Sequence, residues 1–217
     1  MSRTVSVDLV IFDLDGTLID SRVDITNSVN VALRHVGLPP KTVDEMLRMV
    51  GNGTRVLVRR AVAEKPDCFE EAFAAFTKDY AVHLLDHTKL YPGALEAIDF
   101  LSAKKLAVMS NKRQRFCDAI LKGLDIAQRF ASIQGGDTPR AKKPDPAALL
   151  HICEILKIPP ERAAMVGDST VDVAAGKSAG MITVGLTEGF TEAETMKSSG
   201  ANFVLPTVAS LNGGPLH

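Results

Sequence analysis

The chain has few residues of the kinds that cross-link a fold or hold zinc: three cysteines, five histidines and no tryptophan in 217 residues. The cysteines are scattered without a CxxC spacing, and the histidines form no HxH pair, so neither a disulfide framework nor a zinc site is indicated. No run of 18 apolar residues is present to span a membrane, and the N-terminus lacks the apolar core of a signal peptide. We therefore expect a cytoplasmic protein with reduced cysteines.

An excess of charge of one sign is also missing, because 25 basic and 26 acidic residues give a formal net charge of −1. Proteins that bind nucleic acid or anionic membranes usually carry a clustered basic excess. We expect no nucleic-acid partner and no membrane partner, and a monomer or homodimer.

The sequence does contain short apolar runs that alternate with amphipathic segments of helical length. The first run is rich in β-branched residues without clean alternation, which is typical of a strand buried on both faces of a parallel sheet. This alternation predicts an α/β fold with a doubly wound, Rossmann-like parallel sheet. The expected strands are 5–12, 106–109, 163–166, 181–186 and 202–205, and the expected helices are 94–103, 113–124, 146–157 and 171–179.

Residues 19–88 interrupt the alternation, because they show helical periodicity and no convincing strand. Thr42 and Glu45 have the spacing of a capping box at a helix start. A stripe of large residues at spacings of three or four favours packing over a ligand site. These residues are Phe69, Phe73, Phe76, Tyr80 and Leu84. The sequence therefore predicts a helical cap at 19–88, inserted into a core formed by 1–18 and 89–217.

Two acidic motifs follow expected strands, at the sheet edge where open α/β folds bind ligands. In the first, DLDGT, Asp13 and Asp15 lie on the same side of an extended chain, and Thr17 offers a hydroxyl and an N–H to an anion. In the second, Asp168 is followed four residues later by Asp172. Carboxylates without nearby histidine or cysteine favour Mg²⁺. A helix N-terminus alone would explain Asp172, but it would not explain matching acids on another strand.

Two further motifs could bind phosphate. Ser110 and Asn111 follow a strand and begin a helix, where a hydroxyl and free N–H groups cradle anions. Lys143 precedes Pro144, which restricts it to an extended conformation and helps to direct its side chain. Each motif alone is equally typical of a helix cap or of a solvated surface.

Taken together and in this order, DLDGTLIDS, SNK, KKPDP and GDSTVD resemble the four core motifs of the haloacid dehalogenase-like hydrolase superfamily. The helical insertion falls where that superfamily has its cap, and the resemblance covers nearly the whole chain. Within the superfamily, VGNGTRVLVRRA and the later YPG are most similar to phosphoglycolate phosphatases.

The resemblance implies a Mg²⁺-dependent phosphomonoester hydrolase that acts on a small phosphorylated metabolite, such as 2-phosphoglycolate, through an aspartyl phosphate. Asp13 would be the nucleophile and Asp15 the general acid and base. Mg²⁺ would be held by the side chains of Asp13 and Asp168 and the backbone carbonyl of Asp15, with Asp172 orienting metal-bound water. The groups expected to bind the phosphoryl oxygens are Ser110, the Asn111 N–H and Lys143, the last counted with the catalytic residues.

Substrate choice is expected to depend on the cap, since the core motifs contact only the phosphoryl end. Arg55, beside the glycine-rich turn at 51–53, would suit a substrate carboxylate. Arg55 and Arg59 could equally form a solvated helix face. A β-phosphoglucomutase or a pyrophosphatase shares every core motif and stays open as an alternative. A non-enzymatic phospho-acceptor regulatory protein is the alternative from another class, although such receivers have no helical insertion after the first strand.

Overall fold

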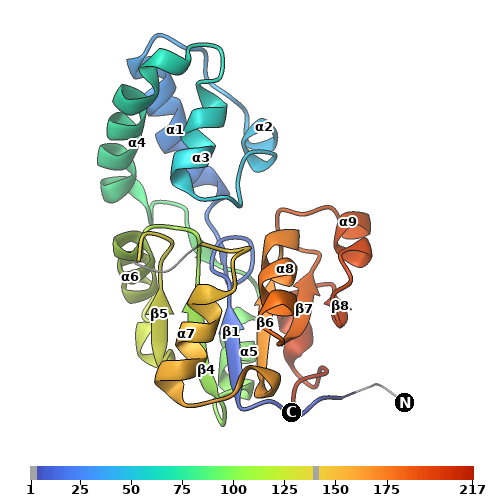
Figure 1. Ribbon diagram of the computed structural model, residues 1–217. Helices are drawn as coiled ribbons and strands as arrows, with labels where there is room; N and C mark the ends of the chain where they lie inside the picture. The colour runs from blue at the N-terminus through green and yellow to red at the C-terminus, as the bar shows by residue number, and fades with distance from the viewer. Residues whose placement is uncertain (1–3, 139–141) are drawn as a thin grey trace.

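A six-stranded sheet forms the lower part of the molecule in a computed structural model that describes residues 4–138 and 142–217 (Figure 1). The sheet order is β5-β4-β1-β6-β7-β8, and each neighbouring pair is parallel. This confirms the predicted α/β class; residues 1–3 and 139–141 of the predicted core lie outside the described residues. The strands are β1 Leu9–Phe12, β4 Lys105–Met109, β5 Ser132–Gln134, β6 Ala163–Gly167, β7 Ile182–Leu186 and β8 Phe203–Leu205.

Helices cover both faces of the sheet. One face packs against α5 Ala94–Phe100 and α6 Gln114–Gly123, and the other packs against α7 Ala147–Leu156 and α8 Thr170–Ser178. The four residues of β1 are fully buried and divide between these two apolar clusters, as expected for a central strand of a parallel sheet.

The chain order reverses direction in the sheet at β1. The chain adds β4 and then β5 on one side of β1, and it then crosses to β6 on the other side. The carboxyl ends of β1 and β6 therefore border the crevice in which doubly wound sheets bind ligands.

Four helices pack together beyond the carboxyl ends of the strands, in the upper part of Figure 1. The predicted capping box at Thr42 and Glu45 is confirmed, and the predicted stripe from Phe69 to Leu84 is buried. No helix within 4–138 or 142–217 is long and apolar enough to cross a membrane. The four helices are α1 Arg22–His35, α2 Val43–Leu47, α3 Thr54–Ala61 and α4 Phe69–His83.

The two chain crossings between the sheet and these helices lie side by side. Strands β2 Ile19–Asp20 and β3 Lys89–Leu90 pair antiparallel. Asp24, 1% exposed at the start of α1, accepts hydrogen bonds from the backbone N–H groups of His87 and Thr88 at 2.7–3.0 Å. The Thr88 hydroxyl donates a further bond of 2.7 Å to the same carboxylate. Asp24 thus fastens the outgoing crossing to the returning one.

Periodicity did not predict β2, β3, β5 or α9 Ala193–Ser198, because none is long enough to show a repeat. The boundaries proposed for the cap, at 18/19 and 88/89, stay a prediction.

Replacing Asp24 by alanine should destabilise the protein, because the buried N–H and hydroxyl of Thr88 and the N–H of His87 lose their acceptor. We expect a fall of about 3 kcal/mol in the free energy of unfolding, measured by urea denaturation. The exposed Glu64→Ala variant is the control and should stay within about 0.5 kcal/mol of the wild type. A loss below about 1 kcal/mol for Asp24→Ala would contradict this role.

Candidate active site

A cavity lies between the carboxyl ends of the strands and the helical part. Both parts of the chain contribute to its walls, so a ligand in it would be enclosed from two sides. The sheet side contributes mainly Asp13, Asp15, Ser110, Asn111, Lys112 and Asp168. The helical side contributes mainly Leu47, Arg48, Val50, Gly51, Thr54 and Leu57.

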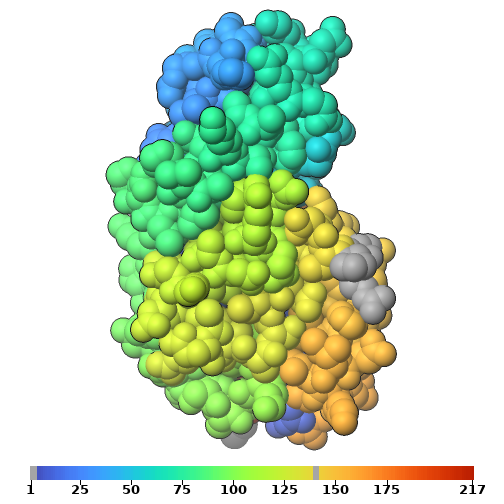
Figure 2. All heavy atoms as spheres, turned by 90° about the vertical axis from the view of Figure 1, so that its left-hand side faces the viewer, coloured from blue at the N-terminus to red at the C-terminus, as the bar shows by residue number. Residues whose placement is uncertain are grey.

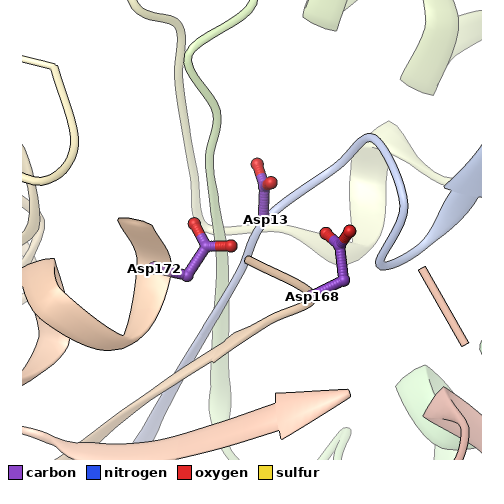
Figure 3. Close-up of side chains that lie close together, drawn as sticks. All are labelled: Asp13, Asp168 and Asp172. Atoms are coloured by element: carbon purple, nitrogen blue, oxygen red, sulfur yellow. The ribbon is translucent and has the colours of Figure 1, made fainter. Parts of the chain in front are cut away.

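Three carboxylates from two neighbouring strand ends converge at the base of this cavity (Figure 3). Asp13 follows β1, Asp168 follows β6, and Asp172 lies in the first turn of α8. Each offers an oxygen atom, and these oxygens lie within 4.8 Å of one another. Gly16, at φ +85°, makes room for this approach, because a Cβ there would overlap the Asp168 carboxylate.

Hydrogen bonds hold two of these carboxylates in place. Asp168 accepts one bond of 3.0 Å from the Thr17 hydroxyl and one of 2.7 Å from the Phe190 N–H. Asp172 accepts the Ser169 hydroxyl at 2.6 Å and the Ser169 N–H at 3.0 Å, in a capping box at the start of α8. Asp168 is therefore held by the segments that follow β1 and β7, and Asp172 is held by the residue that precedes its own helix.

Lys143 is the positive charge among these acids. Its Nζ lies 2.9 Å from Asp13 Oδ1 and 2.7 Å from Asp172 Oδ1, and it donates to the Met109 carbonyl at 2.7 Å. Although burial disfavours the ammonium, the carboxylates of Asp13 and Asp172 raise the pKa of Lys143 above its ordinary value. Lys143 is thus charged and aimed at Asp13, as the position before Pro144 predicts.

The cluster is short of positive charge. Three carboxylates less one ammonium leave two negative charges when all are ionised. Burial raises the pKa of Asp13 to about 6 and that of Asp168 well above its ordinary value, with the neighbouring carboxylates adding to both shifts. The missing charge and the all-oxygen donor set fit a hard divalent cation such as Mg²⁺.

Asp15 lies apart from this cluster and has its own lysine. Its Oδ1 is 2.8 Å from Lys112 Nζ and accepts the Ser21 hydroxyl at 2.5 Å. Lys112 in turn donates to the hydroxyl of Tyr80 at 2.6 Å. Reasoning from the sequence assigned no role to Lys112, although it stands within the SNK motif, and assigned Tyr80 to packing only. The signal available for Lys112 was its place beside Ser110 and Asn111.

Two of the predicted phosphate-binding residues, Ser110 and Asn111, line the same cavity as Asp13. Ser110 and Asn111 follow β4 and are nearly buried. The Asn111 amide donates to the carbonyls of Gly51 and Lys143 at 3.1 and 3.0 Å, so it joins the helical part to the sheet part. Gly53, at φ +87°, also approaches closely, because a Cβ there would lie 2.9 Å from the Asn111 carbonyl oxygen.

Two of the predicted substrate-binding residues do not reach the cavity. Thr17 is 1% exposed, and its hydroxyl is committed to Asp168, so it orients a carboxylate and does not face a ligand. The guanidinium of Arg55 lies over the rings of Phe69 and Phe73, 4.8 and 4.7 Å from their centroids, and pairs with Glu70. The structure therefore gives no support to a substrate contact from either residue.

Within 4–138 and 142–217, Arg48 is the arginine that lines the cavity, and no prediction from the sequence concerned it. It follows α2 directly and is exposed. No ion-pair partner for it occurs among the described residues. The sequence predicted a substrate contact for Arg55, which follows the glycine-rich turn at 51–53. In the structure Arg55 lies on α3, and its side chain contacts Phe69 and Phe73 of α4.

A doubly wound sheet with paired acids after its first strand and a helical insertion defines a class of hydrolases. A family model described as haloacid dehalogenase-like hydrolase matches residues 10–186. The chain belongs to this family, as its four motifs predict.

Several known proteins of similar sequence or structure are described as phosphoglycolate phosphatases. The phosphoglycolate phosphatase of Chromobacterium violaceum is 37% identical over 213 residues, which cover 94% of this chain and 95% of that protein. That of Psychrobacter arcticus is 41% identical over 193 residues, 84% of each chain. The crystal structure of a predicted phosphoglycolate phosphatase from Haemophilus somnus has a TM-score of 0.90 and 33% identity, covering 94% of this chain and 96% of the other.

The electrostatics of the cluster predict that Asp13→Asn stabilises the metal-free protein at alkaline pH. Burial raises the pKa of Asp13 from its ordinary 3.8 to about 6. The folded state therefore favours the protonated Asp13, and the protein loses stability as the pH rises from about 3.8 through 6 and this carboxyl ionises. Asparagine carries no charge and escapes this loss. In EDTA at pH 8, the variant should melt at a higher temperature than the wild type, with a smaller difference at pH 5.

Adding Mg²⁺ at pH 8 should raise the melting temperature of the wild type more than that of Asp13→Asn, because the variant lacks one anionic ligand. A variant that melts below the wild type in EDTA at pH 8 would contradict the proposed charge imbalance.

Proposed function

We propose that this protein is a Mg²⁺-dependent phosphomonoester hydrolase whose substrate is 2-phosphoglycolate. The observation that carries this proposal is the cavity in which Asp13, at the centre of a buried carboxylate and lysine cluster, faces the same space as Asp15. Two acids with separate lysine partners that face one cavity support a division of roles between an attacking group and a proton donor.

Asp13 is the proposed nucleophile. Its carboxylate attacks the phosphorus, the bond to the leaving alcohol breaks, and an aspartyl phosphate forms. Lys143 holds Asp13 Oδ1 at 2.9 Å and supplies a positive charge next to the phosphoryl oxygens. The Ser110 hydroxyl and the Asn111 N–H face these oxygens from the end of β4. Preorganised donors of this kind stabilise the charge that develops during phosphoryl transfer.

Asp15 is the proposed general acid and base. It lines the cavity beside Asp13 and gives a proton to the oxygen of the leaving alcohol. In the second step, it takes a proton from the water that attacks the aspartyl phosphate, which releases phosphate and restores Asp13. Asp15 thus recovers its original state after each turnover.

The proposed Mg²⁺ ligands are the side chains of Asp13 and Asp168 and the backbone carbonyl of Asp15. Asp172 supports the site through its contacts with Lys143 and Ser169. When bound, Mg²⁺ offsets the negative charge of the phosphoryl group and of the carboxylates around it.

Phosphoglycolate as the substrate is supported by the names of the similar proteins and by one feature of the cavity. Among the residues that the structure describes, the cations that line it are Arg48 and Lys112, and Lys112 is paired with Asp15. Arg48 is therefore the positive side chain available to the carboxylate of glycolate, a partner that a guanidinium binds well. This replaces the substrate contact predicted for Arg55.

The proposal includes a cytoplasmic location and a monomeric or homodimeric state. The three cysteines are unpaired and buried, in keeping with a reducing compartment. The match to the hydrolase family and the helices inserted after β1 argue against a non-enzymatic phospho-acceptor. Mutase and pyrophosphatase activities on this scaffold are outcomes of the test below.

The substrate test compares kcat/KM on 2-phosphoglycolate, β-glucose 1-phosphate, pyrophosphate and 4-nitrophenyl phosphate for the wild type, Arg48→Ala and Arg55→Ala. We expect 2-phosphoglycolate to be the best substrate of the wild type. Arg48→Ala should lower kcat/KM on it roughly 10- to 100-fold, the scale of one charged hydrogen bond, through KM. Hydrolysis of 4-nitrophenyl phosphate should hardly change.

Arg55→Ala is the matched control and should leave the ratio between the two substrates unchanged. A wild type that prefers glucose 1-phosphate or pyrophosphate would contradict the substrate assignment. Equal losses on both substrates in Arg48→Ala would contradict the contact with the carboxylate.

A further inference from the structure

Lys112 is a fully enclosed lysine that the proposed chemistry of Asp13 does not use. It is 3% exposed, and the Asp13 cluster already has an ammonium of its own in Lys143. Burying a lysine is costly unless partners compensate it, and a lysine retained inside a protein therefore has specific contacts. Although burial opposes the charge, Asp15 and Tyr80 raise the pKa of Lys112 above its ordinary value. Lys112 is therefore a buried, charged group.

The contacts of Lys112 connect three separate parts of the chain. Its Nζ reaches Asp15 after β1 at 2.8 Å and the hydroxyl of Tyr80 on α4 at 2.6 Å, while its own backbone follows β4. Tyr80 is fully buried, and its ring lies edge-on to Phe116 of α6 with centroids 5.1 Å apart. Figure 2 shows the helical part in direct contact with the sheet part on the face turned toward the viewer. The position of Lys112 is thus fixed from both sides of the cavity.

The two oxygens of Asp15 differ as a result. Oδ1 is held by Lys112 and by the Ser21 hydroxyl at 2.5 Å. Oδ2 has no hydrogen-bond partner among residues 4–138 and 142–217, and Asp15 lines the cavity. Fixing one oxygen from two directions sets the rotation of the carboxyl group, and it leaves the other oxygen for exchange with a ligand.

We propose that Lys112 is a positioning residue for Asp15: with Tyr80 of the helical part behind it, it holds Oδ1 so that Oδ2 transfers the proton to the leaving group. The inference rests on the proposed function, in which Asp15 is the general acid. The proton passes from Asp15 Oδ2 to the oxygen of the departing alcohol as its bond to phosphorus breaks. Lys112 keeps its own protons, and it contacts neither Asp15 Oδ2 nor the oxygen of the departing alcohol.

The leaving group provides a selective test. Glycolate leaves as a poor alkoxide and needs the proton, whereas 4-nitrophenolate is a stable anion that departs without it. A lysine that only positions the general acid should matter for the first substrate and not for the second. A lysine that binds the phosphoryl group, or that only supports the fold, should affect both substrates alike.

We would measure kcat/KM of wild type, Lys112→Met and Tyr80→Phe on 2-phosphoglycolate and on 4-nitrophenyl phosphate, with the exposed Lys122→Met as the matched control. Lys112→Met should lose roughly 10²-fold on 2-phosphoglycolate, within the range that general acid catalysis contributes, and less than about 10-fold on 4-nitrophenyl phosphate. Tyr80→Phe removes one oxygen atom from an otherwise unchanged ring. Tyr80→Phe should show the same preference for a loss of kcat/KM on 2-phosphoglycolate, but with a smaller loss. Lys122→Met should lose activity on neither substrate.

Tyr80→Phe keeps the test decisive if Lys112→Met does not fold, as judged by its thermal unfolding. Equal losses on both substrates in these variants, or no loss in either, would overturn the positioning role while leaving the proposed function intact. A wild type that hydrolyses neither substrate would overturn the proposed function, and the positioning role with it.

Discussion

The candidate active site of this protein depends on holding several carboxylates close together in a buried position. Asp13, Asp168 and Asp172 lie within 4.8 Å of one another, and a single ammonium, that of Lys143, lies among them. Burial disfavours the ionised form of Asp13 and raises its pKa to about 6, and the neighbouring carboxylates add to this shift. The topology of the sheet makes the cluster unavoidable, because β1 and β6 are neighbours and both end in an acidic loop. A divalent cation would relieve this imbalance, and it would also offset the negative charge that a phosphoryl group brings into the site.

A second lysine gives the two proposed catalytic acids, Asp13 and Asp15, different electrostatic surroundings. Asp13 shares Lys143 with Asp172, whereas Asp15, only two residues away, has Lys112 to itself. The two carboxyl groups therefore face different partners despite their closeness in sequence, which suits one to attack and the other to exchange a proton. Because Lys112 also contacts Tyr80 on α4, the surroundings of Asp15 include the helical part of the molecule as well as the sheet.

Much of this was accessible from the sequence, for physical reasons that differ from residue to residue. Fully buried strands such as β1 show as unbroken apolar runs, and acids at their ends are placed by the parallel topology alone, so the sheet and the convergence of Asp13 with Asp168 were predictable. Strand β5, with three residues, has no period to detect. Apart from that of Lys143, which precedes Pro144, the directions of these side chains were not predictable either. Thr17 turns back onto Asp168, Arg55 stacks on Phe69 and Phe73, and Lys112 meets Tyr80 across 32 residues of sequence, and each contact depends on packing between separate elements.

The central claim is that Asp13 attacks phosphorus and becomes an aspartyl phosphate. The direct measurement is to quench the enzyme with acid during turnover of 2-phosphoglycolate with Mg²⁺, reduce it with borohydride, and identify the modified residue by peptide mass spectrometry. Borohydride converts an acyl phosphate of aspartate to homoserine, so the account predicts homoserine at position 13 in the wild type and none without substrate. Homoserine at position 15 or 168, or an unmodified position 13 in an enzyme that is turning over, would contradict it.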